Sequence, residues 1–158
     1  MTAQRIGVGD RFPSFTLPDQ SGNAFALDDV LGKGAVVLFF YPKDGTPGCT
    51  REACSFRDSS ADFLAAGAVV AGISSDDSAS HQQFAAQHGL DYPLLEDVGG
   101  ALRKEVGVAR SMLGLLDGRV TYVLDRAGIV RHVFDSMLGV NKHVEEALVT
   151  ARGIGASQ

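Results

Sequence analysis

The run AVVLFFYP at residues 35–42 constrains the fold of this chain more than any other stretch. It is almost continuously apolar and rich in valine and phenylalanine, which is typical of a central strand covered on both faces. Residues 34–42 are too few to cross a bilayer. A second apolar run, AVVAGIS at 68–74, follows a stretch at 49–66 that lacks proline and glycine and is expected to be a helix. Two buried strands joined by a helix indicate an α/β domain.

The remaining elements follow in a definite order. The pattern predicts a hairpin from 12–17 and 24–27, a helical turn at 28–34, a helix at 75–89, an extended piece at 92–97, a short helix at 98–108, a hairpin from 119–125 and 129–136, and a helix at 141–153. This order predicts a thioredoxin-like fold with a mixed central sheet, an N-terminal hairpin extension and flanking helices. We expect residues 1–158 to form a single domain whose tail, 153–158, is frayed.

Composition and charge exclude several classes of protein. The 158 residues are 45% apolar and 21% charged, which is ordinary for a soluble globular protein. The net charge of −5 argues against nucleic acid or an anionic membrane as a general partner. The N-terminal segment lacks the apolar core of a secretory signal, so we expect a cytoplasmic protein whose thiols stay reduced. No metal-ligand spacing or phosphate-binding glycine motif occurs, so the sequence predicts neither a metal nor an organic cofactor.

Two pairs of polar residues have ordinary structural interpretations. Asp76 and Asp77 follow a predicted strand and are expected to cap the N-terminus of the next helix. His81 and His88 lie seven residues apart on that helix. Their spacing favours a solvated or half-packed helix face rather than a site.

Both cysteines of the chain lie in the segment YPKDGTPGCTREAC at 41–54. Cys49 follows a Pro-Gly turn and begins the helix after the first buried strand, where ligands usually bind in open α/β sheets. The unpaired N–H groups and the positive dipole of a helix start favour a thiolate over a thiol. We therefore expect Cys49 to be an exposed nucleophile. The alternative, a small inert core residue, stays open at this point.

The spacing of Cys49 and Cys54 is too wide for a Cys-x-x-Cys motif. In one α-helix their Cα atoms would lie about 8.7 Å apart and about 140° round the axis. A disulfide requires Cα atoms closer than about 7 Å. The two thiols can therefore bond only if the first one or two helical turns unwind.

These residues resemble a known family. The segment YPKDGTPGCTREACSFRD is similar to the active-site segment of peroxiredoxins of the bacterioferritin-comigratory, or PrxQ, type, an atypical 2-Cys group. Pro42, Thr46 and Cys49 match the family signature Pro-x-x-x-Thr-x-x-Cys, and Cys54 matches the second cysteine of this group. The segment VGDRFPSFTLPDQSG at 8–22 resembles the family's opening, and GRVTYVLDRAGIV places the family's active-site arginine at Arg119. Asp-Gly stands in the loop where Ala-Asp or similar is usual, which leaves the loop's details open.

The resemblance implies a thiol peroxidase and gives each matched residue a role. Cys49 would attack a hydroperoxide and become a sulfenic acid. Arg119 would stabilise the thiolate and bind the peroxide oxygens, and Thr46 would hydrogen-bond both the peroxide and the sulfur. Pro42 would shield the site from water. Glu52 would support the loop network, although a first-turn carboxylate favoured by the helix dipole explains it equally well.

The resemblance also implies how the enzyme is recycled. Cys54 would condense with the sulfenic acid to an intramolecular disulfide, which thioredoxin or a similar dithiol would reduce. An internal resolving cysteine needs no partner subunit, so a monomer is expected. Two other functions compete with the peroxidase: a protein thiol–disulfide oxidoreductase, which lacks a Cys-x-x-Cys pair here, and an interaction protein without chemistry, which the intact set of active-site residues argues against.

Overall fold

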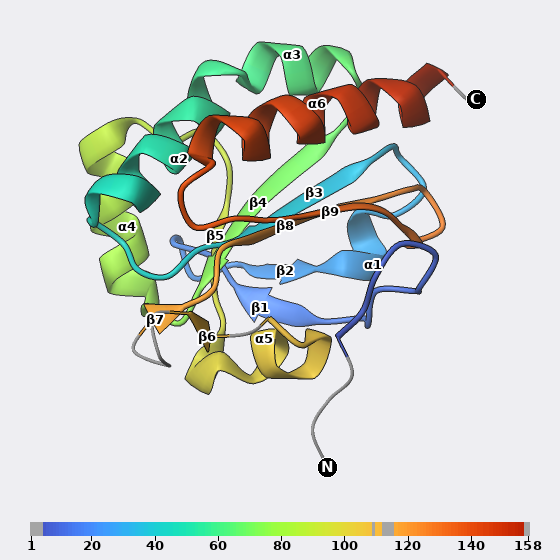
Figure 1. Cartoon of the computed structure of the whole chain (residues 1–158). Coiled ribbons are helices and arrows are strands. Elements are labelled where there is room, and N and C mark those ends of the chain that lie inside the picture. Colours follow the sequence, from blue (N-terminus) through green and yellow to red (C-terminus); the bar gives the residue numbers. More distant parts are fainter. Residues whose placement is uncertain (1–4, 109, 112–115, 157–158) are drawn as a thin grey trace.

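The computed structural model describes residues 5–108, 110–111 and 116–156 (Figure 1). In chain order its elements are β1 (Thr16–Pro18), β2 (Ala24–Ala26), α1 (Leu27–Val30), β3 (Val36–Phe40), α2 (Pro47–Asp58), α3 (Ser60–Ala65), β4 (Val69–Ser74), α4 (Ser78–His88), β5 (Leu94–Glu96), a 3-10 turn (Val98–Gly100), α5 (Ala101–Val106), β6 (Arg110–Ser111), β7 (Leu116–Asp117), β8 (Val120–Leu124), β9 (Val130–Asp135) and α6 (Val140–Ala156). No helix in the described ranges has the length and apolar character needed to span a membrane.

The central sheet has the strand order β5-β4-β3-β8-β9. β3 pairs in parallel with β4, and β4 with β5, whereas β8 runs antiparallel to both β3 and β9. The predicted α/β fold with a mixed central sheet is therefore confirmed. The N-terminal hairpin β1–β2 and the hairpin β8–β9 are also present, although the strand predicted at 12–17 is wrong for 12–15 because β1 begins at Thr16.

Strand β3 is buried along its whole length because its side chains alternate between two cores. Val37 and Phe39 lie in a core with side chains of α2, α3, α4 and α6. Leu38 and Phe40 lie in a second core with side chains of the N-terminal segment, α1 and α5. Figure 1 shows the same division, with α2, α3 and α6 over one face of the sheet and the β1–β2 hairpin and α5 on the other side. The apolar run was thus interpreted correctly.

The helix predicted at 49–66 is wrong in two respects. It begins earlier, at Pro47, because proline at the first helical position lacks only an N–H that would be unpaired anyway. It also divides at Ser59, whose φ of −98° and ψ of 7° end α2 before α3 begins. Ser60 follows the break, and its hydroxyl donates to the carbonyl of Phe56 at 3.4 Å, a local side-chain-to-backbone bond of the kind that competes with regular helix.

The frayed tail expected at 153–158 is wrong for residues 153–156, because α6 continues to Ala156. Residues 157–158 lie outside the described ranges. The buried positions Val140, Val144, Ala147 and Ala151 hold α6 along the sheet. Apolar contact over the length of the helix compensates for the glycines near its end.

Candidate active site

The first turn of α2 carries Cys49. Thr46 lies before the helix in an extended conformation, with φ −75° and ψ 151°, and its carbonyl accepts from the N–H of Thr50 at 2.8 Å. Cys49 belongs to the same core as Phe39 and Tyr41 and is only 1% exposed. The expectation of an exposed thiol is therefore wrong, because the turn packs against the end of β3 instead of projecting into solvent.

Arg119 reaches Cys49 from the residue before β8. Its Nη2 donates to Cys49 Sγ at 3.4 Å, its Nη1 to Glu52 Oε1 at 2.6 Å, and its Nε to the carbonyl of Met137 at 3.2 Å. Burial would lower the pKa of Arg119, but the charges of Glu52 and Cys49 raise it above its ordinary value. The guanidinium is thus a fixed cation beside the sulfur.

Gly48 leaves the space that this contact requires. A Cβ placed on Gly48 would lie 3.0 Å from Arg119 Nη2. Glycine before the cysteine therefore allows the guanidinium to approach the first turn of α2 closely. Cys49 and Arg119, which are 70 residues apart in the chain, are in contact here.

Glu52 is fully buried one turn further along α2. Its Oε1 accepts from Arg119, whereas its Oε2 has no hydrogen-bond partner in the part of the chain that the structure describes. Burial raises the pKa of Glu52 to about 7, although the charge of Arg119 opposes the rise. Glu52, for which the sequence predicted at most a supporting role, is thus a buried acid in direct contact with Arg119.

His143, on α6, lies behind Glu52 and was missed as part of the site. Its Nδ1 is 3.6 Å from Glu52 Oε2 and 2.7 Å from the hydroxyl of Thr121, and its Nε2 faces the carbonyl of Ser136 at 2.7 Å. Burial lowers the pKa of His143 to about 4, and the charge of Arg119 acts in the same direction. The signal available in the sequence was helical spacing, because His143 lies on the buried stripe of α6.

The loop before α2 holds Pro42 and Thr46. The hydroxyl of Thr46 donates to the carbonyl of Lys43 at 2.9 Å. A hydroxyl has one proton, so Thr46 keeps its lone pairs as acceptors but does not donate to Cys49 Sγ here. Pro42 is half-buried and lies two residues after the end of β3. The structure thus brings Cys49, Arg119 and Glu52 together and leaves the roles of Pro42 and Thr46 as predictions.

Cys54 lies in the second turn of the same helix and is half-buried. Both cysteines are free thiols, and α2 is continuous from Pro47 to Asp58. The separation of about 8.7 Å between their Cα atoms that helix geometry gives therefore applies to this structure. Within the described ranges no group of histidine, cysteine, aspartate or glutamate side chains is arranged to hold a metal ion.

A buried thiol at a helix start, an arginine against its sulfur and a mixed sheet covered by helices define a thiol-dependent enzyme of thioredoxin-like architecture. Comparisons with known proteins give the particular family. Residues 8–133 match the AhpC/TSA family. The chain is 49% identical over 144 residues to the chloroplastic peroxiredoxin Q of Suaeda salsa and 47% identical to that of Populus jackii. These matches cover 91% of this chain and 67% of each plant protein.

Solved structures agree with the sequence matches. Peroxidoxin BcpB from Mycobacterium tuberculosis superposes with a TM-score of 0.86 at 42% identity, covering 93% of this chain and 97% of that one. The bacterioferritin comigratory protein of Xanthomonas campestris gives 0.81 at 31% identity, covering 89% and 92%. The chain belongs to the AhpC/TSA family and is a thiol-dependent peroxidase of the peroxiredoxin Q type.

Proposed function

We propose that Cys49, as a thiolate, attacks the terminal oxygen of a hydroperoxide. The S–O bond forms as the O–O bond breaks, the sulfur is oxidised to a sulfenic acid, and the released alkoxide or hydroxide leaves as alcohol or water after taking a proton. The contact of Arg119 Nη2 with Cys49 Sγ carries this proposal. A guanidinium fixed beside a buried sulfur stabilises both the thiolate and the charge that develops on the peroxide oxygens.

The residues around the sulfur have supporting roles in the proposal. Glu52 orients Arg119 through its bond to Nη1. Thr46 accepts a hydrogen bond from the peroxide, which its free lone pairs allow. Pro42 shields the loop from bulk water. Backbone N–H groups at the start of α2 orient the substrate and stabilise negative charge.

Cys54 then resolves the sulfenic acid. Its thiol attacks Cys49, the S–S bond forms, the S–O bond breaks and water leaves. Because α2 keeps the two cysteines apart, its first turns unwind before the disulfide forms. A thioredoxin-type dithiol reduces the disulfide by exchange and is itself oxidised.

The burial of Cys49 supports a small substrate. A thiol that is 1% exposed is accessible to a small peroxide through minor side-chain movement, whereas a protein disulfide requires an open approach. This argues against the alternative of a protein thiol–disulfide oxidoreductase acting from the folded state. Hydrogen peroxide and alkyl hydroperoxides are the proposed substrates, and alkyl peroxide reduction is the activity ascribed to the similar Xanthomonas campestris protein.

The chain is proposed to act as a monomeric single domain in the cytoplasm. An intramolecular disulfide needs no second subunit, and both cores pack on one sheet. The plant relatives are named as chloroplastic proteins, so the compartment of this chain is tested separately by fractionation. Light scattering after size exclusion, with oxidised and reduced protein, tests the monomer.

Peroxide consumption with a thioredoxin system tests the function. Cys49→Ser is expected to be inactive. Cys54→Ser is expected to react once, gaining one oxygen by mass, and then to turn over poorly. Normal turnover of Cys49→Ser would show that another residue reacts and that the proposal is wrong.

Amide exchange tests the unwinding step. Oxidised protein is expected to exchange faster than reduced protein at residues 49–56, because the disulfide and the intact helix exclude each other. Equal protection in both redox states would refute local unwinding.

A further inference from the structure

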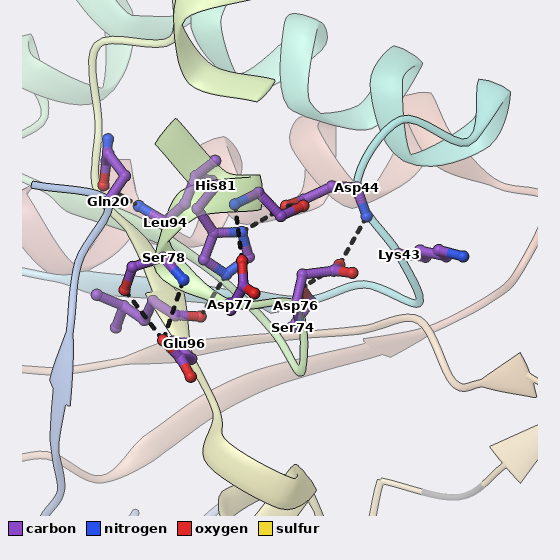
Figure 2. A network of polar contacts seen from close by, with 12 residues as sticks. Gln20, Lys43, Asp44, Ser74, Asp76, Asp77, Ser78, His81, Leu94 and Glu96 are labelled. Carbon is purple, nitrogen blue, oxygen red and sulfur yellow. Dashed lines mark hydrogen bonds and ion pairs between the residues drawn. The ribbon is translucent and has the colours of Figure 1, made fainter. Parts of the chain in front are cut away.

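The loop 41–46 places the first turn of α2, and its anchor lies outside the thiol site. The loop joins β3 to α2 and contains Pro42 and Thr46. Lys43 and Gly45 are exposed, but the side chain of Asp44 between them is only 5% exposed. Figure 2 shows Asp44 turned from the loop toward His81 of α4.

Asp44 makes four hydrogen bonds, and three of them join the loop to residues outside it. Its Oδ2 contacts His81 Nδ1 at 2.6 Å and accepts from Ser80 Oγ at 2.9 Å. Its Oδ1 accepts from the hydroxyl of Tyr41 at 2.6 Å. Its backbone N–H donates to Asp76 Oδ2 at 2.8 Å (Figure 2). The side chain and the backbone N–H of Asp44 therefore both bind the loop to α4 and to the residues before it.

The partners of His81 determine that it is charged. Its Nε2 faces the carbonyl of Leu95 at 3.0 Å, and its Nδ1 faces the carboxylate of Asp44. Both partners accept, and a neutral imidazole has only one ring proton, so only the imidazolium satisfies both. His81 is completely buried, so it forms a buried ion pair with Asp44. The expected solvated or half-packed position of His81 is therefore wrong.

The polar groups around His81 also favour its charged form. Burial would lower the pKa of His81, but the hydrogen bond and charge of Asp44, with the Leu95 carbonyl and the charge of Asp76, raise it. The hydroxyl of Tyr41 lies 3.5 Å from Nδ1. From β5, the carboxylate of Glu96 is turned away to the N–H and hydroxyl of Ser78, both at 3.0 Å.

Asp76 and Asp77 were both expected to cap α4, but their side chains have different partners. Asp77 caps α4 as expected, because its side chain accepts from Ser80 N at 2.8 Å. Asp76 instead accepts from Asp44 N and from Ser74 Oγ, also at 2.8 Å, so its assignment as a helix cap is wrong. The chain thus contains a helix cap that does not contact the loop, beside an aspartate that does.

We propose that Asp44 and His81 are positioning residues for peroxide reduction: their buried ion pair holds the loop so that Thr46 and the first turn of α2 present Cys49 to the peroxide. This rests on the proposed function of Cys49. Removing one partner of a buried ion pair leaves the other charge uncompensated, so the anchor depends on both residues.

The position of the anchor also fits a helix that unwinds in every cycle. Residue 44 precedes the segment that must open, so the loop stays fixed while Cys49 moves. Starting a helix is unfavourable because several residues must be ordered for the first hydrogen bond. A loop that keeps Thr46 in its extended conformation provides a fixed point from which α2 forms again.

The test compares Asp44→Asn and His81→Gln with the matched control Asp77→Ala. The rate constant for oxidation of Cys49 by hydrogen peroxide is measured in single turnovers. We expect about tenfold lower rates in Asp44→Asn and His81→Gln, since misplacing a reacting group costs one to two orders of magnitude. Asp77→Ala weakens α4 and lowers the melting temperature but keeps the wild-type rate.

Two readouts separate positioning from simple destabilisation. The ratio of the wild-type rate to the His81→Gln rate is expected to fall toward one as the pH rises through the pKa of His81, because the ion pair is then lost. In reduced protein, amides at 43–50 are expected to exchange faster in Asp44→Asn and His81→Gln and to stay protected in Asp77→Ala. This second readout requires no peroxidase activity, so it tests the anchor even if Cys49 proves unreactive.

Each result decides one proposal. If the wild type oxidises Cys49 and both anchor variants match its rate at every pH, the positioning role is wrong. An equal loss of rate in Asp77→Ala would show that the loss comes from the lower stability of α4. This result would also overturn the positioning role. A wild-type Cys49 that does not react refutes the proposed function instead. If Asp44→Asn does not fold, His81→Gln supplies both readouts.

Discussion

Two buried histidines lie beside carboxylates, and they differ in charge. His81 pairs with Asp44 at 2.6 Å, and its pKa is raised. His143 lies 3.6 Å from Glu52, and its pKa is lowered to about 4. Both side chains are fully buried, so burial alone does not distinguish them.

The remaining partners explain the difference. His81 faces two acceptors, Asp44 and the Leu95 carbonyl, and needs two protons. His143 faces one carbonyl and the hydroxyl of Thr121, which can donate to its Nδ1. The negative charge of Glu52 is already engaged by Arg119, whose own charge opposes a second cation at His143. One pair therefore works as an ion pair and the other as a neutral support.

Among the variants that test this comparison of the two histidines, replacing Arg119 is expected to have the largest effect. Arg119→Gln removes the cation beside Cys49 and should lower the rate of Cys49 oxidation by about 100-fold or more. It should also raise the pKa of His143 and that of Glu52, because the guanidinium lowers both. Stopped-flow kinetics and histidine NMR titration measure these effects.

Arg131→Gln is the control for the loss of an arginine. Arg131 pairs with Asp125 on the surface at 2.8 Å, an arrangement that contributes little. An unchanged rate in Arg119→Gln would contradict the central role of the guanidinium.

Glu52→Gln tests whether the buried acid orients Arg119 through its charge. Since the pKa of Glu52 is about 7, the wild type loses this carboxylate as the pH falls. The wild-type rate should exceed that of Glu52→Gln about tenfold above pH 8, and the two should converge below pH 6. Pre-steady-state rates across this range, with Glu145→Gln as the exposed control, measure the ratio. A ratio independent of pH would mean that the charge of Glu52 is irrelevant.

The two histidines predict opposite effects of pH on stability. The pKa of His143 is lowered below its unfolded value, so its contribution is present above about pH 6.5 and is lost as the pH falls toward 4. The pKa of His81 is raised, so its contribution is present below about pH 6.5 and is lost as the pH rises through the folded value.

Urea unfolding of wild type, His81→Gln and His143→Gln between pH 4 and 9 measures these contributions. The difference from wild type is expected to shrink by about 1 kcal/mol or more on acidification for His143→Gln, and on alkalinisation for His81→Gln. If the difference in free energy of unfolding from wild type changed with pH in the same direction for both variants, the inferred difference in charge between the two histidines would be wrong.

Gly48→Ala gives the smallest expected effect. Its Cβ would lie 3.0 Å from Arg119 Nη2, so the guanidinium must shift slightly. We expect a rate reduction of a few-fold, consistent with a small misplacement. Gly45→Ala is no match for it, because Gly45 has a φ of 80° that alanine adopts poorly. Gly153→Ala, with no atom within 4 Å of the added Cβ, is the better control.

Much of the fold followed from local chemistry. The continuous apolar runs predicted β3 and β4, and turn residues between short extended segments predicted both hairpins. Element boundaries were weaker, since Pro47 extended α2 backward and Ser59 ended it early. Cys49 could be picked out because its position after a turn and before a helix is a local property, but its burial depends on how α2 packs against β3.

The polar network was the least predictable part of the site. His81 and His143 both lie on predicted helices, and the sequence showed the partner of neither. Asp44, noticed only as a departure from the usual family loop, makes the hydrogen bonds from this loop to Asp76 and His81. These pairs join residues far apart in the chain, so no local pattern contains them.

The sequence by itself determined the order of the central-sheet strands along the chain, the position of the thiols and the impossibility of a disulfide within an intact helix. Those follow from apolar periodicity, turn chemistry and the fixed rise of an α-helix. The sequence did not predict β6, β7 or the division between α2 and α3. The tertiary structure decided that Cys49 is buried, that Arg119 contacts its sulfur, and which histidine is charged. The charge of a buried group depends on the donors and acceptors around it, and those are brought together only when distant segments pack.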